Sequence, residues 1–186
     1  MNLPAGVWTI ASDWANLAEA EAWIKKTSAA DAWTFRNPQV TEREALGLLR
    51  RMKGKAPWLA VHGRSDWANL VQADALIGGH GGLPWEELAQ RKTSGQALGF
   101  SVHNDVEWQR AKDCLADFIF FSPVYPTPSK EAILEVQGLE VLADVCARGI
   151  PVIALGGILT RTEAQSCMDA GAHAVAVLRA AGELIL

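Results

Sequence analysis

Cysteine is scarce in this 186-residue chain, and clusters of basic residues are missing. The three cysteines, Cys114, Cys146 and Cys167, are odd in number and have no close paired spacing. This pattern favours free, buried thiols in a cytoplasmic protein over a zinc site. A net charge of −4 without a basic run argues against nucleic acid and against anionic membranes as partners.

Long hydrophobic runs are absent as well. No apolar stretch approaches the length of a membrane span, and the N-terminus lacks the basic-then-apolar pattern of a signal peptide. No low-complexity linker divides the chain. Because 49% of the residues are hydrophobic, we expect one folded domain, residues 1–186, with a core of its own.

Short apolar segments alternate with helical segments throughout, which predicts a parallel α/β sheet. The eight predicted strands lie at residues 6–11, 32–36, 58–62, 75–77, 97–102, 118–121, within 151–158, and at 174–178. None shows the signals of an edge strand, so we expect closure into a (β/α)8 TIM barrel. The fold usually needs about 250 residues, so this barrel is expected to be compact.

The stretch 151–158 is central to this prediction. Its apolar run is followed by Gly156 and Gly157, and then by Thr160 and Thr162, either of which can cap a helix. The pattern is typical of a buried strand and a tight turn. Backbone N–H groups before a helix can hold phosphate, and barrels bind phosphate after their last two strands. The alternative is a plain strand–turn–helix whose glycines serve packing only.

Two further features concern the helices. One hexapeptide occurs at residues 12–17 and again at 65–70, each time after a strand, so each copy is expected to begin a helix. Ser12 or Asp13 can cap the first of these helices. Residues 181–186 are too few for a full eighth helix, which predicts a truncated last helix. We expect a second copy to cover the exposed wall, giving a homodimer or a higher oligomer.

Polar residues gather where the predicted strands end, which is the working edge of a parallel barrel. Ser101 and His103 are two residues apart, so strand alternation points both side chains the same way. The candidate proton-transfer groups are His103 and His62, and the candidate ligand-binding residues are Arg36, Ser101, Thr127, Ser129, Lys130, Gly156, Gly157, Leu178 and Arg179. Such a set suits proton transfer on a small phosphorylated substrate. For both histidines, a structural role is the alternative.

Four segments carry a family resemblance. They are GFSVH at 99–103, SPVYPTPSK at 122–130, ALGGI at 154–158 and GAHAVAVL at 171–178. Together they resemble the thiamine phosphate synthase/TenI family, over nearly the whole chain and most strongly in its second half. The resemblance implies a (β/α)8 barrel that binds thiazole phosphate.

Departures from the family pattern separate its two branches. The synthase branch joins a pyrimidine diphosphate to thiazole phosphate and needs Mg²⁺, which takes carboxylate ligands. Gly63 and Gly82 stand where the resemblance places its metal-binding aspartates, and its Gln-x-Arg-x-Lys segment keeps only Arg36. The sequence therefore favours the TenI branch and makes synthase activity unlikely on this comparison. That branch is an isomerase, a thiazole tautomerase that needs neither metal nor cofactor.

The resemblance also implies roles for single residues. His103 corresponds to the catalytic histidine of the TenI branch and would act as general acid and base, with His62 or a water as second proton site. Arg36 would face the substrate carboxylate, and Gly156–Gly157 its phosphate. Arg179 replaces the family's usual serine, so it either pairs with phosphate or fills the pocket. Two alternatives stay open: a synthase with altered ligands, and a non-catalytic or regulatory protein that binds thiazole phosphate.

Overall fold

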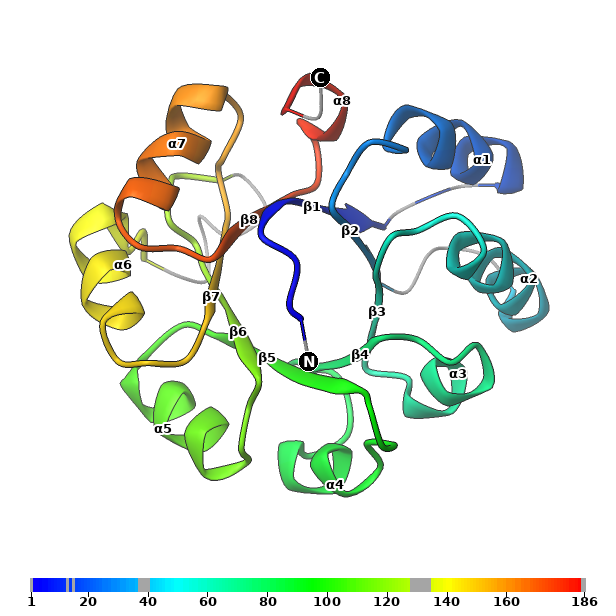
Figure 1. The fold of residues 1–186 in the computed structure, drawn as a ribbon, viewed down its shortest axis with the longest axis horizontal. Helices are drawn as coiled ribbons and strands as arrows, with labels where there is room; N and C mark the ends of the chain where they lie inside the picture. Colours follow the sequence, from blue (N-terminus) through cyan, green and yellow to red (C-terminus); the bar gives the residue numbers. More distant parts are fainter. Residues whose placement is uncertain (1, 13, 15, 37–40, 128–134, 185–186) are drawn as a thin grey trace.

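The computed structural model describes residues 2–12, 14, 16–36, 41–127 and 135–184. Eight parallel strands form a closed barrel, in which each strand pairs with the next and β8 pairs with β1 (Figure 1). The strands are β1 (Gly6–Ala11), β2 (Ala32–Phe35), β3 (Leu59–His62), β4 (Ala75–Gly78), β5 (Ala97–Val102), β6 (Phe118–Phe121), β7 (Val152–Leu155) and β8 (Ala174–Val177). The predicted (β/α)8 barrel is confirmed, and every predicted strand is present.

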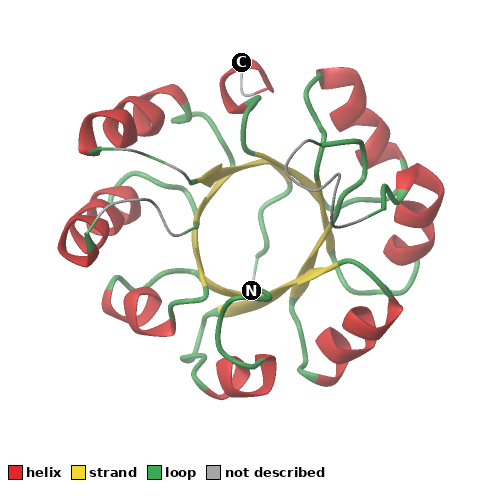
Figure 2. Ribbon diagram, turned by 180° about the vertical axis from the view of Figure 1, so that it is seen from behind, coloured by secondary structure: helices red, strands yellow, loops and turns green. Residues whose placement is uncertain are grey.

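Helices surround the barrel as an outer ring, which Figure 2 shows from the opposite side. They are α1 (Leu17–Lys26), α2 (Glu42–Lys53), α3 (Ser65–Leu70), α4 (Trp85–Gln90), α5 (Asp105–Asp113), α6 (Gly138–Cys146), α7 (Arg161–Asp169) and α8 (Ala181–Leu184). Their apolar faces and the outward-facing strand residues form one continuous core between the two layers. The barrel interior holds a second, separate core.

Polar side chains cap several helices, and Thr160 does so as the sequence predicts. At α2 the Thr41 side chain accepts from the Glu44 N–H, while the Glu44 carboxylate accepts from the Thr41 N–H. Asn104 caps α5, and Thr160 forms a second such reciprocal pair at α7. Each cap satisfies N–H groups that have no partner inside the helix, which fixes where the helix begins.

The repeated hexapeptide does not begin both helices in the same way. The cap of α1 is Asn16, near the end of the first copy, so the prediction that Ser12 or Asp13 caps this helix is wrong. Asp13 itself lies outside the described residues. The second copy is itself α3, and Asn69, the counterpart of Asn16, lies within that helix. The surroundings of each copy therefore decide its structure, and the local sequence does not.

Large aromatic side chains fill the inside of the barrel. The Trp8 ring centroid lies 4.7 Å from that of Trp58 and 5.4 Å from that of Phe118. The N-terminal segment crosses the middle of the ring in Figure 1. Its Leu3 carbonyl forms a 3.0 Å hydrogen bond with the His173 imidazole, which directly precedes β8. This segment precedes β1, so it covers the amino ends of the strands. The carboxyl ends form the opposite edge, at which the predicted functional residues lie.

The last helix that the structure describes, α8, has four residues. Association of two copies over the adjoining wall stays a prediction, as does the description of residues 1–186 as one domain. Among the residues that the structure describes, none of the helices is both long and apolar enough to span a bilayer.

All three cysteines are free, as the sequence predicts, although only Cys167 is fully buried and the other two are half-buried. Burial raises the pKa of Cys146 to about 11 and contributes most to raising that of Cys167 to about 11 as well. At neutral pH both groups are therefore protonated thiols, and a protonated thiol is a poor nucleophile.

Two glycines, one facing the barrel interior and one on α2, should respond in opposite ways to substitution by alanine. A Cβ atom added at Gly99 would lie 2.3 Å from the Phe118 ring, which is fully buried against Trp8. We expect Gly99→Ala to lower the free energy of unfolding by about 1–3 kcal/mol because the ring has no room to move. Gly47 lies within α2 with no atom in the way, so Gly47→Ala should raise the same quantity by about 0.5–1 kcal/mol. Urea unfolding of both variants checks this, and equal effects would contradict it.

Candidate functional site

A small pocket opens at the carboxyl ends of β7, β8, β1 and β2. It encloses about 90 Å³, well below the roughly 300 Å³ of a pocket that holds a whole drug-sized ligand. Its lining includes six of the predicted binding residues, namely Arg36, Thr127, Gly156, Gly157, Leu178 and Arg179. Barrel closure thus brings together side chains from opposite ends of the chain. The size suits one anionic group of a ligand.

The wall of this pocket is the turn that follows β7. Gly156 and Gly157 have φ angles of +99° and +70°, a backbone conformation that glycine adopts without strain. A Cβ atom at Gly157 would lie 2.5 Å from the Pro126 carbonyl oxygen. The Tyr125 N–H donates to the Gly156 carbonyl at 3.0 Å, which ties the turn to the loop after β6. Both glycines are therefore needed for this close approach, and they also line the pocket.

Two backbone groups in this turn remain able to bind an anion. Glu163 accepts hydrogen bonds from the Leu159 and Thr160 N–H groups at 2.8 and 2.9 Å, so the start of α7 is satisfied by its own side chain. Within the described residues, the N–H groups of Gly157 and Ile158 have no hydrogen-bond partner. The groups of this pocket that remain open to an anion are therefore those of the turn, and phosphate binding there, with or without Arg179, stays a prediction.

His62 is the last residue of β3, and its ring lies 5.8 Å from that of Phe120 in the barrel interior. Among the described residues its Nε2 atom is buried without a hydrogen-bond partner, and so is the Thr34 hydroxyl on the neighbouring strand. Burial, with a smaller contribution from the positive charge of Arg36, lowers the pKa of His62 to about 3. The imidazole is therefore neutral at physiological pH, and its proton-transfer role stays a prediction.

His103 lies on a different part of the same edge, directly after β5. Its Nδ1 atom is 2.9 Å from a carboxylate oxygen of Glu107 and 3.4 Å from Nε2 of His80. His103 is buried, and Ser101, the candidate two residues earlier, is half-buried at the end of the same strand. The sequence analysis missed Glu107 and His80 as members of the site. The sequence did carry a signal for Glu107: it lies four residues after His103 across the start of a helix, a spacing that can bring two side chains together.

Two of the predicted binding residues, Ser129 and Lys130, lie outside the described residues. The remaining candidates thus form two groups. One lines the pocket near β7 and β8, and the other lies at the ends of β3 and β5. Their roles in binding and catalysis stay predictions.

The residues present do not fit a magnesium ion at the place that the resemblance implies. Gly63 and Gly82 pack against each other, and a Cβ atom at Gly82 would lie 3.4 Å from the Gly63 Cα. The nearest carboxylate along the chain, Asp66, accepts two hydrogen bonds from Arg64, at 2.9 and 2.7 Å. Mg²⁺ needs carboxylate anchors, and among the described residues these two loops offer it none in that position.

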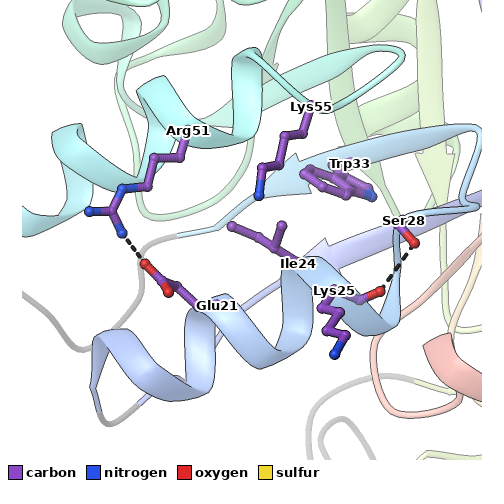
Figure 3. A pocket seen from close by; sticks show the side chains of 7 residues that line it. All are labelled: Glu21, Ile24, Lys25, Ser28, Trp33, Arg51 and Lys55. Carbon is purple, nitrogen blue, oxygen red and sulfur yellow. Dashed lines mark hydrogen bonds and ion pairs between the residues drawn. The ribbon is translucent and has the colours of Figure 1, made fainter.

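A larger groove lies between α1 and α2, away from the carboxyl edge (Figure 3). Its polar groups are largely engaged with one another. Arg51 is paired with Glu21, and the Ser28 hydroxyl donates to the Lys25 carbonyl at 3.1 Å.

Fold and pocket define a (β/α)8 barrel whose cationic and backbone N–H groups gather at the carboxyl ends of the last strands. Barrels of this class typically bind phosphorylated ligands there. The chain belongs to the thiamine monophosphate synthase family, whose model matches residues 10–181. This confirms the family resemblance, although the match does not distinguish the TenI branch.

Named relatives are similar to parts of this chain. It is 37% identical over 123 residues to a thiamine-phosphate synthase of Salinibacter ruber, covering 66% of this chain and 54% of the relative. A thiamine-phosphate synthase of Geobacillus kaustophilus is 40% identical over 120 residues, covering 62% of this chain and 54% of the relative. The chain thus spans about half the length of these two relatives.

A solved structure supports the fold alone. Thiamine phosphate pyrophosphorylase from Pyrococcus furiosus superposes with a TM-score of 0.80 at 23% identity, covering 97% of this chain and 92% of that one.

The relatives correct the sequence analysis on one point. The prediction of an isomerase, with synthase activity made unlikely, is wrong: the similar proteins are named thiamine-phosphate synthases, which are transferases. The prediction was based on glycine at two positions and on a segment that keeps only Arg36, and similarity over more than a hundred residues outweighs both. The names favour the alternative that the sequence left open.

The buried neutral state of His62 makes a prediction about stability and pH. A free histidine has a pKa of about 6.5, so between that pH and about 3 the unfolded chain takes up a proton and the folded one does not. The free energy of unfolding is therefore highest above pH 6.5 and falls as the pH decreases. We expect the native chain to lose about 1.4 kcal/mol more than His62→Gln between pH 7.5 and 5.5. Urea unfolding at both pH values checks this, and parallel losses would contradict it.

Proposed function

We propose that this protein catalyses thiamine-phosphate synthesis, the joining of a thiazole phosphate to a pyrimidine diphosphate. The observation that carries the proposal is the similarity to thiamine-phosphate synthases at 37–40% identity. The pocket supports it, because it places cationic and N–H groups where a phosphorylated ligand binds to barrels of this class.

In the proposed complex the thiazole phosphate binds by its anionic end. The N–H groups of Gly157 and Ile158 donate to phosphate oxygens, and the Arg179 guanidinium supplies charge-assisted hydrogen bonds from the other wall. Arg36 lies across the same pocket and adds positive charge. The position of Arg179 in the lining of this pocket supports its proposed role in binding.

The reaction forms one bond and breaks one. The thiazole ring nitrogen donates its electron pair to the carbon that carries the diphosphate, and the bond from that carbon to oxygen breaks. Diphosphate leaves with the electron pair of that bond. The residues at this edge of the barrel must therefore stabilise the growing negative charge of the leaving group. Among the described residues that line the pocket, Arg36, which directly follows β2, supplies positive charge for this purpose.

A second candidate function is binding of thiazole phosphate without turnover. It is favoured by the contact between Gly63 and Gly82, because the described part of these loops supplies no carboxylate for a magnesium ion. Both candidates use the same pocket, so they differ in product formation and agree in ligand binding.

Substitution of Arg179 tests the binding step that both candidates share. A charge-assisted hydrogen bond contributes about 1.5–3 kcal/mol, so Arg179→Ala should weaken thiazole phosphate binding about 10- to 100-fold in calorimetry. Arg50→Ala, an exposed position on α2, is the matched control and should leave the affinity unchanged. Equal affinity in the two variants would remove Arg179 from the site.

Incubation of the native chain with thiazole phosphate and the pyrimidine diphosphate, with and without Mg²⁺, tests the reaction itself. Thiamine phosphate in the product mixture establishes the synthase. Binding without product establishes the second candidate, and an absence of both binding and product overturns the proposed site.

A further inference from the structure

Three potential metal ligands converge at the carboxyl ends of β4 and β5. His80 lies in the loop after β4, His103 directly follows β5, and Glu107 lies in the first turn of α5. Nδ1 of His103 is 2.9 Å from Oε2 of Glu107, Nε2 of His80 is 3.1 Å from Oε1 of Glu107, and the two nitrogens are 3.4 Å apart. Three separate elements thus bring three electron-pair donors to one point.

The local fold holds the carboxylate in position. Asn104 caps α5 by accepting from the Glu107 N–H, which fixes the backbone of Glu107 relative to the strand end. The His103 N–H donates to Oε2 of Glu107 at 2.7 Å. These two bonds leave Oε1 facing His80, so the carboxylate is oriented by the backbone before any ligand arrives. Such fixed orientation is typical of metal-binding carboxylates.

The spacing of these atoms matches the edges of a small coordination polyhedron. Nitrogen and oxygen ligands about 2.0–2.1 Å from a tetrahedral zinc ion are about 3.3 Å from one another. The separations of 2.9 and 3.1 Å end on different oxygens of the Glu107 carboxylate, and the two ring nitrogens are 3.4 Å apart, so each measured pair lies near this value. One proton can be shared by only two of these groups at a time. A cation placed between them can contact both imidazoles and the carboxylate together.

We propose that His80, His103 and Glu107 bind a divalent first-row transition-metal ion, with zinc as the reference case. Two imidazoles and one carboxylate form a donor set that these ions prefer, and Mg²⁺ and Ca²⁺ prefer oxygen ligands. The His80 side chain is 68% exposed, so an ion can enter from solvent, and Glu107 and His103 are 16% and 5% exposed. Three protein ligands leave the fourth position open, which is the arrangement of zinc sites that also bind a water or a substrate.

The inference goes beyond the proposed function and does not depend on it. The three residues do not line the pocket of Arg36 and Arg179, and the proposed reaction uses none of them. Metal binding and thiamine-phosphate formation are measured in separate experiments. A negative result for one proposal therefore does not contradict the other.

Cobalt absorption and zinc calorimetry test the site in the full chain, without a histidine tag and after chelator treatment. We expect one equivalent of Co²⁺ to bind with the visible spectrum of a four-coordinate ion and without thiolate charge-transfer bands, and Zn²⁺ to displace it. Thiolate bands would move the metal to the cysteines and overturn the proposal. Binding of Co²⁺ as a six-coordinate ion, with no displacement by Zn²⁺, would overturn it as well.

Single variants assign the ligands. His80→Ala is the cleanest, because an exposed loop side chain contributes little to folding, and Glu107→Gln keeps the shape of the carboxylate without its charge. Loss of a residue that only orients a ligand weakens metal binding about 10- to 100-fold, so loss of a ligand should weaken it at least tenfold. His173→Gln, at the other end of the barrel, is the control and should bind as the native chain does. Equal Zn²⁺ affinity in His80→Ala and His173→Gln would overturn the site.

Discussion

Pairing between β1 and β8 is the constraint on which the rest of the molecule depends. It runs from Gly6 opposite Ala174 to Thr9 opposite Val177, and it joins the two ends of an otherwise open parallel sheet. All strands are parallel and follow one another in order, so closure places their eight carboxyl ends on one edge. Arg36 and Arg179 meet in one pocket for this reason alone, since almost the whole chain separates them in sequence.

Closure also limits what the interior can hold, and this affects the site. The Phe118 ring fits because a residue without a side chain, Gly99, faces it. Phe120 on the same strand packs near His62, so the packing of the core places the imidazole. The buried position then keeps His62 neutral through the loss of hydration. The residues that fill the barrel interior therefore also determine the ionisation state of His62.

Much of the fold and half of the candidate site could be predicted from the sequence. The apolar runs and the Gly156–Gly157 turn are local patterns, and the fold rules for parallel sheets bring them together at one edge. His80 approaches His103 and Glu107 only because β4 and β5 are neighbours in the sheet, so the segments that follow them begin at the same edge. The neutral state of His62 depends on burial, which no short pattern contains. The repeated hexapeptide shows the same limit, because Asn16 caps a helix while Asn69 lies inside one.

The contact between Gly63 and Gly82 connects these observations. Carboxylates facing each other on these two loops would repel unless a cation lay between them. Glycine removes both the charge and the side-chain volume, so the loops approach until only backbone atoms separate them. Glycine at both positions is therefore consistent with the close contact of the two loops. At the same edge, His80 from the loop that also carries Gly82 converges with His103 and Glu107.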